Sequence, residues 1–328
     1  MNILVTGGAG YIGSATAEAL VKAGHSVTVY DSLVTGHRAA VPEGAAFIQA
    51  DLSDSHTLAK ALTDQRFEAV MHFAASIEAG ESMKDPGRFY QNNFTNSLSL
   101  METAVRAGVK RFVLSSTAAV FQSSDEPLTE ESPLGPTNVY GHTKLMVEQA
   151  LDWYRKIHGL HFAALRYFNA SGALPGRGEA HQPETHLIPL VLRVPLGQRD
   201  AVQIYGTDYP TPDGTCIRDY IHIADLVSAH LLALDGLSDG NCLIYNLGSG
   251  SGYSVREVIE TARQVTGHPI PVHEMPPRPG DSARLVASSE KIKRELGWQP
   301  EHDNLHEIIS SAWEWHRSHP NGYEEQTI

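Results

Sequence analysis

The sequence is poor in cysteine and has no long uncharged apolar run. Its 328 residues include only two cysteines, Cys216 and Cys242. Two cysteines make no disulfide framework, which is typical of a reducing compartment. No apolar run reaches the roughly 18 residues that a membrane span needs. The segment 1–5 reads as a strand and not as the basic start of a signal peptide. We therefore expect a cytoplasmic protein without a membrane anchor.

Positive charge is also scarce. The 25 Lys and Arg residues face 38 Asp and Glu residues, which gives a formal net charge of −13. Nucleic acids and anionic membranes repel such a surface, so we expect neither as a partner. An anionic small molecule can still bind where a few arginines are locally placed. No metal is expected, because His302 and His306, although four residues apart, are more typical of surface histidines.

What the sequence does contain is a regular alternation of apolar strands and amphipathic helices. The strands are expected at 3–5, 27–30, 46–48, 69–73, 112–114 and 162–165, and the helices at 11–23, 88–107 and 139–158. This order predicts right-handed βαβ units in a doubly wound parallel sheet over residues 1–170, with ligands at the carboxyl ends of the strands. Residues 171–328 are expected to form a smaller C-terminal α/β domain that binds the substrate. Some of its elements can pack back on the sheet.

A glycine motif joins the first strand to the first helix. Gly7, Gly10 and Gly13 have the spacing G-x-x-G-x-x-G, and glycine is needed where the backbone approaches a pyrophosphate closely. The phosphates would meet the N–H groups at the start of this helix, around Tyr11 and Ile12. The motif follows a strand and opens a helix, so it predicts a Rossmann-type dinucleotide site.

An acidic residue after the second strand indicates which dinucleotide binds. Asp31 would accept hydrogen bonds from the adenosine ribose and repel a 2′-phosphate, which favours NAD over NADP. The alternative is that Asp31 only caps a turn. The residues after the next two strands are expected to contact the cofactor as well: Asp51 and Leu52 at the adenine, and Phe73, Ala74 and Ala75 beneath it.

A Tyr-x-x-x-Lys pair stands at the start of the helix at 139–158. Tyr140 and Lys144 are four residues apart and therefore share a helix face. A tyrosine with its usual pKa of about 10 is a poor base, but a neighbouring ammonium and a positive nicotinamide would lower that pKa. Thr117 ends the fifth strand, where its hydroxyl can share a hydrogen bond with a substrate oxygen. Together these three residues predict proton-transfer chemistry beside the dinucleotide.

These motifs together resemble the extended short-chain dehydrogenase/reductases. Further segments narrow the resemblance to the UDP-glucose 4-epimerases of that family, over nearly the whole chain. They are 80–82, Asn92-Asn93, 166–169, 205–211, 213–222 and Arg278-Pro279-Gly280-Asp281.

The resemblance implies a role for each matching residue. Tyr140 is the base, Lys144 orients the nicotinamide ribose, and Thr117 holds the reacting hydroxyl while C4 of a UDP-hexose is inverted through a 4-keto intermediate. Asn93 and Phe168 border the nicotinamide. The residues implied for the substrate are Asn169, His186, Leu187, Gln203, Ile204, Tyr205, Arg218, Tyr220, Arg278, Asp281 and Leu285. The arginines would bind the diphosphate and Asp281 the ribose. The resemblance also implies a homodimer that pairs the helices at 88–107 and 139–158.

Several alternatives stay open. Some epimerases carry other residues at Glu78 and His186, so the contacts of the sugar pocket are not fixed by the resemblance. A 4,6-dehydratase would need acids after Thr117, where this chain has two alanines. A UDP-glucuronate 4-epimerase would need an additional cation, which the sequence neither shows nor excludes. An NAD-sensing regulator would not need Tyr140 and Lys144. Leu285 is smaller than the tyrosine found there in some relatives, so we expect N-acetylated UDP-hexoses to fit; the alternative is a core leucine.

Overall fold

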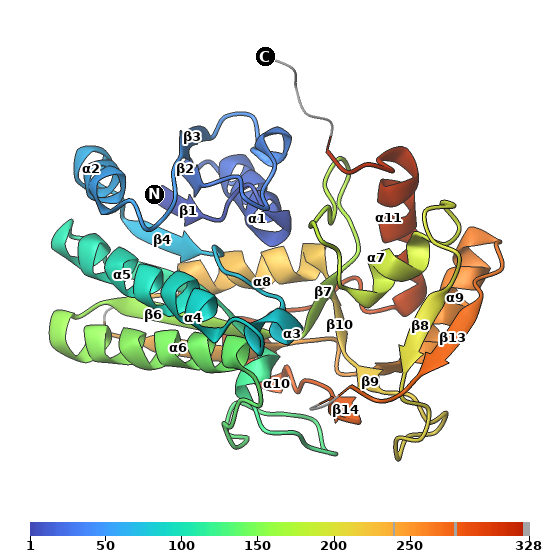
Figure 1. Cartoon of the computed structure of the whole chain (residues 1–328). Helices are drawn as coiled ribbons and strands as arrows, with labels where there is room; N and C mark the ends of the chain where they lie inside the picture. The colour runs from blue at the N-terminus through green and yellow to red at the C-terminus, as the bar shows by residue number, and fades with distance from the viewer. Residues whose placement is uncertain (239, 279–280, 324–328) are drawn as a thin grey trace.

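Seven parallel strands form one sheet at the centre of the protein (Figure 1). The computed structural model describes residues 1–238, 240–278 and 281–323. The strand order is β11-β6-β5-β4-β1-β2-β3. The bounds are β1 Asn2–Thr6, β2 Ser26–Asp31, β3 Ala46–Gln49, β4 Ala69–His72, β5 Arg111–Thr117, β6 His161–Tyr167 and β11 Cys242–Leu247. The doubly wound parallel sheet predicted from the sequence is confirmed.

Side chains on successive positions of each strand enter two different cores, one on each face of the sheet. In β1, Ile3 and Val5 join a core with α1 (Tyr11–Lys22) and α8 (Ile223–Gly236). Leu4, between them, joins the other core with α2 (Ser55–Gln65), α5 (Asn96–Arg106) and α6 (Val139–His158). Strands buried on both faces read as continuous apolar runs, which is why they were recognisable in the sequence.

The long helix expected at 88–107 is interrupted. It consists of α4 (Pro86–Phe89), a π-helical segment at Tyr90–Thr95, and α5. Asn93 lies in the π-helical segment and is 1% exposed. π-Helical turns are uncommon and are frequent at functional sites, and the helical periodicity of the sequence does not reveal them.

The residues beyond 170 divide between the sheet and a second core. β11 is an edge strand of the sheet, and α8 packs in the core on one of its faces, as the sequence analysis allowed. The second core lies among α7 (Leu187–Leu192), α9 (Val255–Thr266), α11 (Leu305–Ser318), β8 (Val202–Tyr205) and β10 (Tyr220–His222). Figure 1 shows these helices together at one side of the molecule. The domain boundary at residue 170 therefore stays a prediction, because β11 and α8 follow it in sequence but return to the first part of the fold.

The remaining elements are short. They are α3 (Ala79–Ser82), β7 (Asn169–Ser171), β9 (Ile217–Arg218), β12 (Tyr253–Ser254), β13 (Val272–Met275), β14 (Arg284–Leu285), α10 (Glu290–Leu296), and 3-10 turns at Arg38–Ala40 and Ala118–Val120. Strand β7 pairs with β10, and β9 lies between β12 and β14. Among the described residues, no helix has the length and apolar character that crossing a membrane requires.

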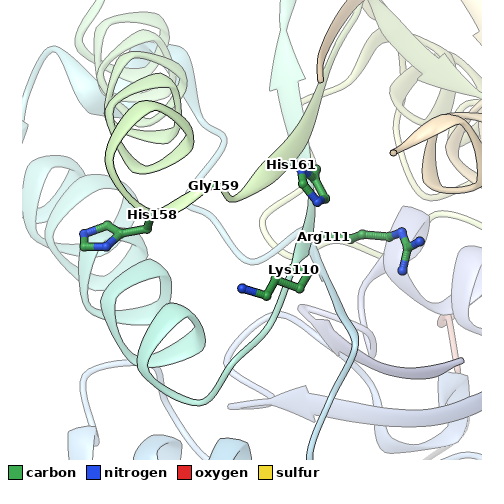
Figure 2. Close-up of a pocket in the computed structure, with 5 residues that line it drawn as sticks. All are labelled: Lys110, Arg111, His158, Gly159 and His161. Carbon is green, nitrogen blue, oxygen red and sulfur yellow. The ribbon is translucent and has the colours of Figure 1, made fainter. Parts of the chain in front are cut away.

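A cavity of about 430 Å³ opens at the amino ends of β5 and β6 (Figure 2). It is lined by Lys110, Arg111, His158, Gly159 and His161. Figure 2 shows the side chains of Arg111 and His158 pointing away from each other, so they do not converge on one ligand. Because ligands of such sheets bind at the carboxyl ends of the strands, this cavity lies at the wrong edge for the predicted site.

Candidate active site

The glycine loop leaves no room for side chains. A Cβ on Gly13 would lie 2.1 Å from the carbonyl oxygen of Gly7, and one on Gly7 would lie 2.5 Å from the backbone nitrogen of Ala74. Gly7 also has a φ of +71°, which favours glycine. Helix α1 then begins at Tyr11, with Gly10 as its N-cap and no side-chain cap. Its first N–H groups are therefore available to a pyrophosphate.

Asp31 caps a turn, which was the alternative considered from the sequence, and it also keeps acceptor positions for a ribose. Its carboxylate accepts hydrogen bonds from the backbone N–H of Ala9 at 3.0 Å and of Leu33 at 2.8 Å. It therefore caps a turn and ties the end of β2 to the glycine loop. Burial raises the pKa of Asp31 against the effect of these two hydrogen bonds. A carboxylate has about four acceptor positions, so acceptors remain for the ribose hydroxyls. These residues fit NAD.

The other residues expected at the cofactor follow the neighbouring strands. Asp51 is exposed and Leu52 is buried. Phe73, Ala74 and Ala75 are half-buried after β4. Tyr11 donates from its hydroxyl to the carbonyl oxygen of Gly172 at 2.7 Å, and Ile12 packs beside the core under α1. The predicted cofactor residues therefore meet at the carboxyl edge of the sheet.

The amide of Asn93 links two parts of the site. Its oxygen accepts from the Ser76 N–H at 2.8 Å, and its nitrogen donates to the Ser76 carbonyl at 2.9 Å and to the Thr143 hydroxyl at 3.2 Å. Ser76 follows β4, where the cofactor residues lie, and Thr143 is in α6. Asn93 therefore holds the cofactor loop against the helix that carries Tyr140.

The start of α6 is fixed at three points. The Asn138 side chain accepts from the N–H of Gly141 at 2.8 Å and caps the helix. The N–H of Tyr140 donates to the Ser82 hydroxyl at 3.1 Å. A Cβ on Gly141 would lie 2.2 Å from the carbonyl oxygen of Ala119, so glycine is what lets α6 touch the turn after Thr117. The same approach brings Tyr140 into a hydrogen bond with the Thr117 side chain.

Burial dominates the electrostatics of this group in the protein alone. Burial raises the pKa of Tyr140 to about 12, with a further rise from Glu78 and an opposing hydrogen bond from Thr117. Lys144 donates to the carbonyl oxygen of Ser115 at 2.8 Å, and burial lowers its pKa to about 8 despite the charge of Glu148. In the protein alone, desolvation therefore outweighs the lowering expected from Lys144.

A buried ion pair lies next to Lys144 and was not predicted from the sequence. Glu148 lies one turn beyond Lys144, and its carboxylate accepts from Arg166 Nη2 at 2.6 Å, with both side chains 4% exposed. The Ser116 hydroxyl also donates to Glu148, and the Ser115 hydroxyl hydrogen-bonds to Tyr167. The two serines that precede Thr117 thus anchor β5 to α6 and β6. No spacing signal predicts these pairs.

The residues expected at the nucleotide form two pairs. Arg218 Nη2 lies 3.7 Å from an Asp281 carboxylate oxygen. The Arg278 guanidinium lies 3.8 Å from the centre of the Tyr205 ring, a cation–π geometry. The Tyr205 hydroxyl donates to Gln203 at 2.6 Å. Pro279 and Gly280, named in the same motif, lie outside the described residues.

Asp219, next to Arg218, is a buried anchor that the sequence did not single out. It is 0% exposed, and its carboxylate accepts from the N–H groups of Ser249, Gly250 and Ala287. Its carbonyl oxygen accepts from the Asn169 side chain at 2.8 Å. Asp219 therefore fixes the backbone that carries Arg218 and Asn169.

The remaining substrate residues have different surroundings. His186 and Leu187 stand half-exposed at the start of α7. Ile204 and Tyr220 are 1% and 4% exposed and lie in the second core. The backbone of Ile204 is the part left to meet a ligand, and a contact of Tyr220 with the substrate stays a prediction.

Leu285 is partly buried and packs against the cluster of Val120, Phe121 and Leu128, as Phe168 does. It therefore belongs to an apolar cluster that includes Phe168, a residue expected at the nicotinamide. Within the described ranges, no three His, Cys, Asp or Glu side chains come together as a metal site.

Known proteins resemble this chain over almost its full length. Residues 3–248 match the NAD dependent epimerase/dehydratase family. A UDP-glucose 4-epimerase of Halalkalibacterium halodurans is 49% identical over 98% of this chain and 98% of its own. The structure of a UDP-glucose 4-epimerase from Bifidobacterium longum in complex with NAD+ and UDP has a TM-score of 0.94 at 36% identity, covering 98% of this chain and all of its own.

A UDP-Glc/GlcNAc 4-epimerase from Campylobacter jejuni is similar as well. Its structure has a TM-score of 0.84 at 39% identity, and the match covers 97% of this chain and 99% of that one.

Proposed function

The chain belongs to the NAD dependent epimerase/dehydratase family, and on that premise we propose that it inverts C4 of a UDP-hexose, interconverting UDP-glucose and UDP-galactose. The observation that carries this proposal is the meeting of Tyr140, Thr117 and Lys144 at the carboxyl edge of a sheet built for NAD. The relatives that carry the name UDP-glucose 4-epimerase support it over nearly the full chain.

Each of the three side chains has a distinct task. Tyr140 Oη takes the proton from the 4-hydroxyl of the sugar and later returns a proton to the 4-keto intermediate. The Thr117 side chain, which hydrogen-bonds to Tyr140, holds the same substrate oxygen in line. Lys144 is held at the Ser115 carbonyl, where its ammonium can stabilise a phenolate and orient the nicotinamide ribose. Bound NAD supplies the hydride acceptor and, once reduced, the hydride donor.

Inversion requires that the sugar turns while the nucleotide stays. Arg218, Asp281 and Arg278 provide fixed polar groups for the uridine diphosphate. Asp219 holds the backbone next to Arg218 in place, so the Arg218 guanidinium is preorganised for the diphosphate. Tight binding of the nucleotide and few fixed contacts to the sugar allow the 4-keto sugar to present its other face.

A direct assay tests this function. Purified protein with NAD is incubated with UDP-galactose, and formation of UDP-glucose is measured. Because each turnover regenerates the cofactor, no net NADH should accumulate. A protein that binds NAD and UDP-sugars without forming the C4 epimer would contradict the proposal and favour the sensing role.

A 4,6-dehydratase is disfavoured by the turn after Thr117. Ala118 and Ala119 occupy the 3-10 turn where an acid would be needed for elimination. The same turn is in close contact with Gly141 at the start of α6. Elimination chemistry therefore has no acid at this place.

We also propose that the sugar pocket accepts N-acetylated UDP-hexoses. Leu285 packs against the same apolar cluster as Phe168 and lacks the bulk and hydroxyl of a tyrosine. The similarity to a UDP-Glc/GlcNAc 4-epimerase supports this extension. Turnover of UDP-N-acetylglucosamine by the wild type tests it directly.

The proposed assembly is a homodimer. Trp153 and Ile157 in α6 are 62% and 67% exposed, and Leu98 in α5 is 37% exposed. Large apolar side chains on neighbouring helices are typical of a covered surface. Sedimentation of the wild type and of Trp153→Glu tests this assembly, with a shift from dimer to monomer expected. The cytoplasm remains the proposed location, in keeping with two free cysteines.

A further inference from the structure

Glu78 lies at the N-terminus of α3, the short helix that contacts the catalytic tyrosine. It is the N-cap residue of α3, and the Ser82 hydroxyl at the other end of α3 accepts from the Tyr140 N–H at 3.1 Å. Figure 1 shows α3 close to α6. The Glu78 side chain is 14% exposed, and its carboxylate lies 3.5 Å from His181 Nε2. A partly buried carboxylate is thus held between the cofactor half of the molecule and the loop after β7.

The charge of Glu78 acts on the reacting group. Burial is the main cause of the raised pKa of Tyr140, and the Coulomb effect of Glu78 adds to it. Burial would lower the pKa of His186, but its hydrogen bond to Glu184 and the charges of Glu179, Glu184 and Glu78 outweigh burial and raise that pKa to about 9. Glu78 therefore influences both Tyr140 and His186, two residues expected at the sugar.

The loop after β7 contains acids and histidines but only one arginine. Glu179 and Glu184 come from the same loop as His181 and His186, and His186 Nδ1 lies 2.8 Å from Glu184. Burial raises the pKa of Glu179, so Glu184, paired with His186, is the more readily ionised acid of this loop. Arg177, the arginine of this loop, is engaged with Glu18 at 2.9 Å. The region therefore offers no spare arginine to a sugar carboxylate.

We propose that Glu78 determines substrate specificity by excluding UDP-sugars that carry a carboxylate at C6, so that the site takes neutral UDP-hexoses. This inference rests on the proposed function, since it concerns the sugar end of the same site. A hexuronate differs from glucose by one negative charge at almost equal size. Like charges brought together in a partly buried site repel strongly, whereas the CH₂OH group of glucose can donate a hydrogen bond to the same carboxylate.

Equilibrium binding to the NAD-loaded protein tests the proposal. Calorimetric titration compares UDP-glucose with UDP-glucuronate. In the wild type, UDP-glucuronate is expected to bind at least ~10-fold more weakly. Glu78→Gln removes the charge at nearly constant shape and should reduce the ratio of the two dissociation constants, UDP-glucuronate over UDP-glucose, by ~10-fold. Glu78→Asp keeps the charge and should preserve this ratio.

Two further variants complete the design. Glu78→Ser also removes the charge and introduces a good N-cap for α3, so it gives the same test if Glu78→Gln does not fold. Glu81→Gln removes a charge from the same helix, but Glu81 is half-exposed and paired with Lys84 at 2.8 Å. This control should leave the ratio unchanged.

The outcomes separate this proposal from the proposed function. Equal affinities of the wild type for the two ligands would overturn the inference, as would an unchanged ratio in both folded variants that lack the Glu78 charge. Because the ratio of affinities does not depend on epimerisation, finding the expected ratios in a protein that does not epimerise UDP-galactose would contradict the proposed function alone.

Discussion

Replacing Glu148 by Gln removes the charge that compensates a buried arginine. The Glu148 carboxylate accepts from Arg166 Nε at 3.0 and 3.2 Å and from Nη2 at 2.6 Å, and both side chains are 4% exposed. A glutamine keeps the volume but leaves the guanidinium without a counter-charge. Removing one partner of a buried pair costs ~3–5 kcal/mol, so the free energy of unfolding should fall by that amount.

Urea denaturation of the variant and the wild type measures this loss. Glu260→Gln is the matched control, since Glu260 pairs with Arg263 at 3.1 Å on the surface of α9 with 58% of its side chain exposed. Exposed pairs contribute ~0–1 kcal/mol. Replacing both partners, Glu148→Leu with Arg166→Met, should recover much of the loss, because neither charge is then buried. A loss below ~1 kcal/mol for Glu148→Gln would refute the reasoning.

Three other perturbations have defined outcomes. Asp31→Ala should relax discrimination against NADP, measured as the ratio of the dissociation constants of the two cofactors; a wild type that prefers NADP would refute this ribose assignment. Leu285→Tyr should reduce kcat/KM for UDP-N-acetylglucosamine by roughly tenfold or more, because overpacking costs ~1–3 kcal/mol, and should spare UDP-galactose; an unchanged ratio would leave Leu285 as a core residue. Burial lowers the pKa of Lys144 from 10.5 to about 8, so between pH 8 and pH 10.5 the unfolded state binds more protons and the free energy of unfolding should rise with pH. Lys144→Met should lose that rise in the cofactor-free protein. The same pH dependence of stability in the wild type and the variant would contradict this prediction.

Local sequence patterns were sufficient to predict the sheet and to single out the residues that we propose for the centre of the site. Strands such as β1 are short apolar runs before a glycine or polar residue, and βαβ chirality then leaves few topologies. Gly7 and Gly13 are recognisable because their spacing serves one turn, and Tyr140 with Lys144 because one helical turn separates them. These features depend on neighbouring residues, which a single sequence displays.

Interactions between distant residues could not be read in the same way. Glu148 and Arg166 look like ordinary surface charges until α6 and β6 are placed side by side. The buried role of Asp219 depends on the 249–250 and 287 backbone. The pKa of Tyr140 was expected to fall beside both Lys144 and a positive nicotinamide; in the protein alone, burial by the whole fold raises it. The residues were visible, but the desolvation and pairing that give them their roles come from tertiary packing.

The central claim is that Tyr140 is the base that removes the proton from the sugar hydroxyl. Tyr140→Phe keeps the ring and deletes the oxygen that hydrogen-bonds to Thr117. With NAD bound, we predict that kcat for conversion of UDP-galactose to UDP-glucose falls by at least ~100-fold, the lower range for loss of a general base, while the affinities for NAD and UDP are retained. A phenylalanine variant that binds both ligands and turns over at nearly the wild-type rate would contradict the account.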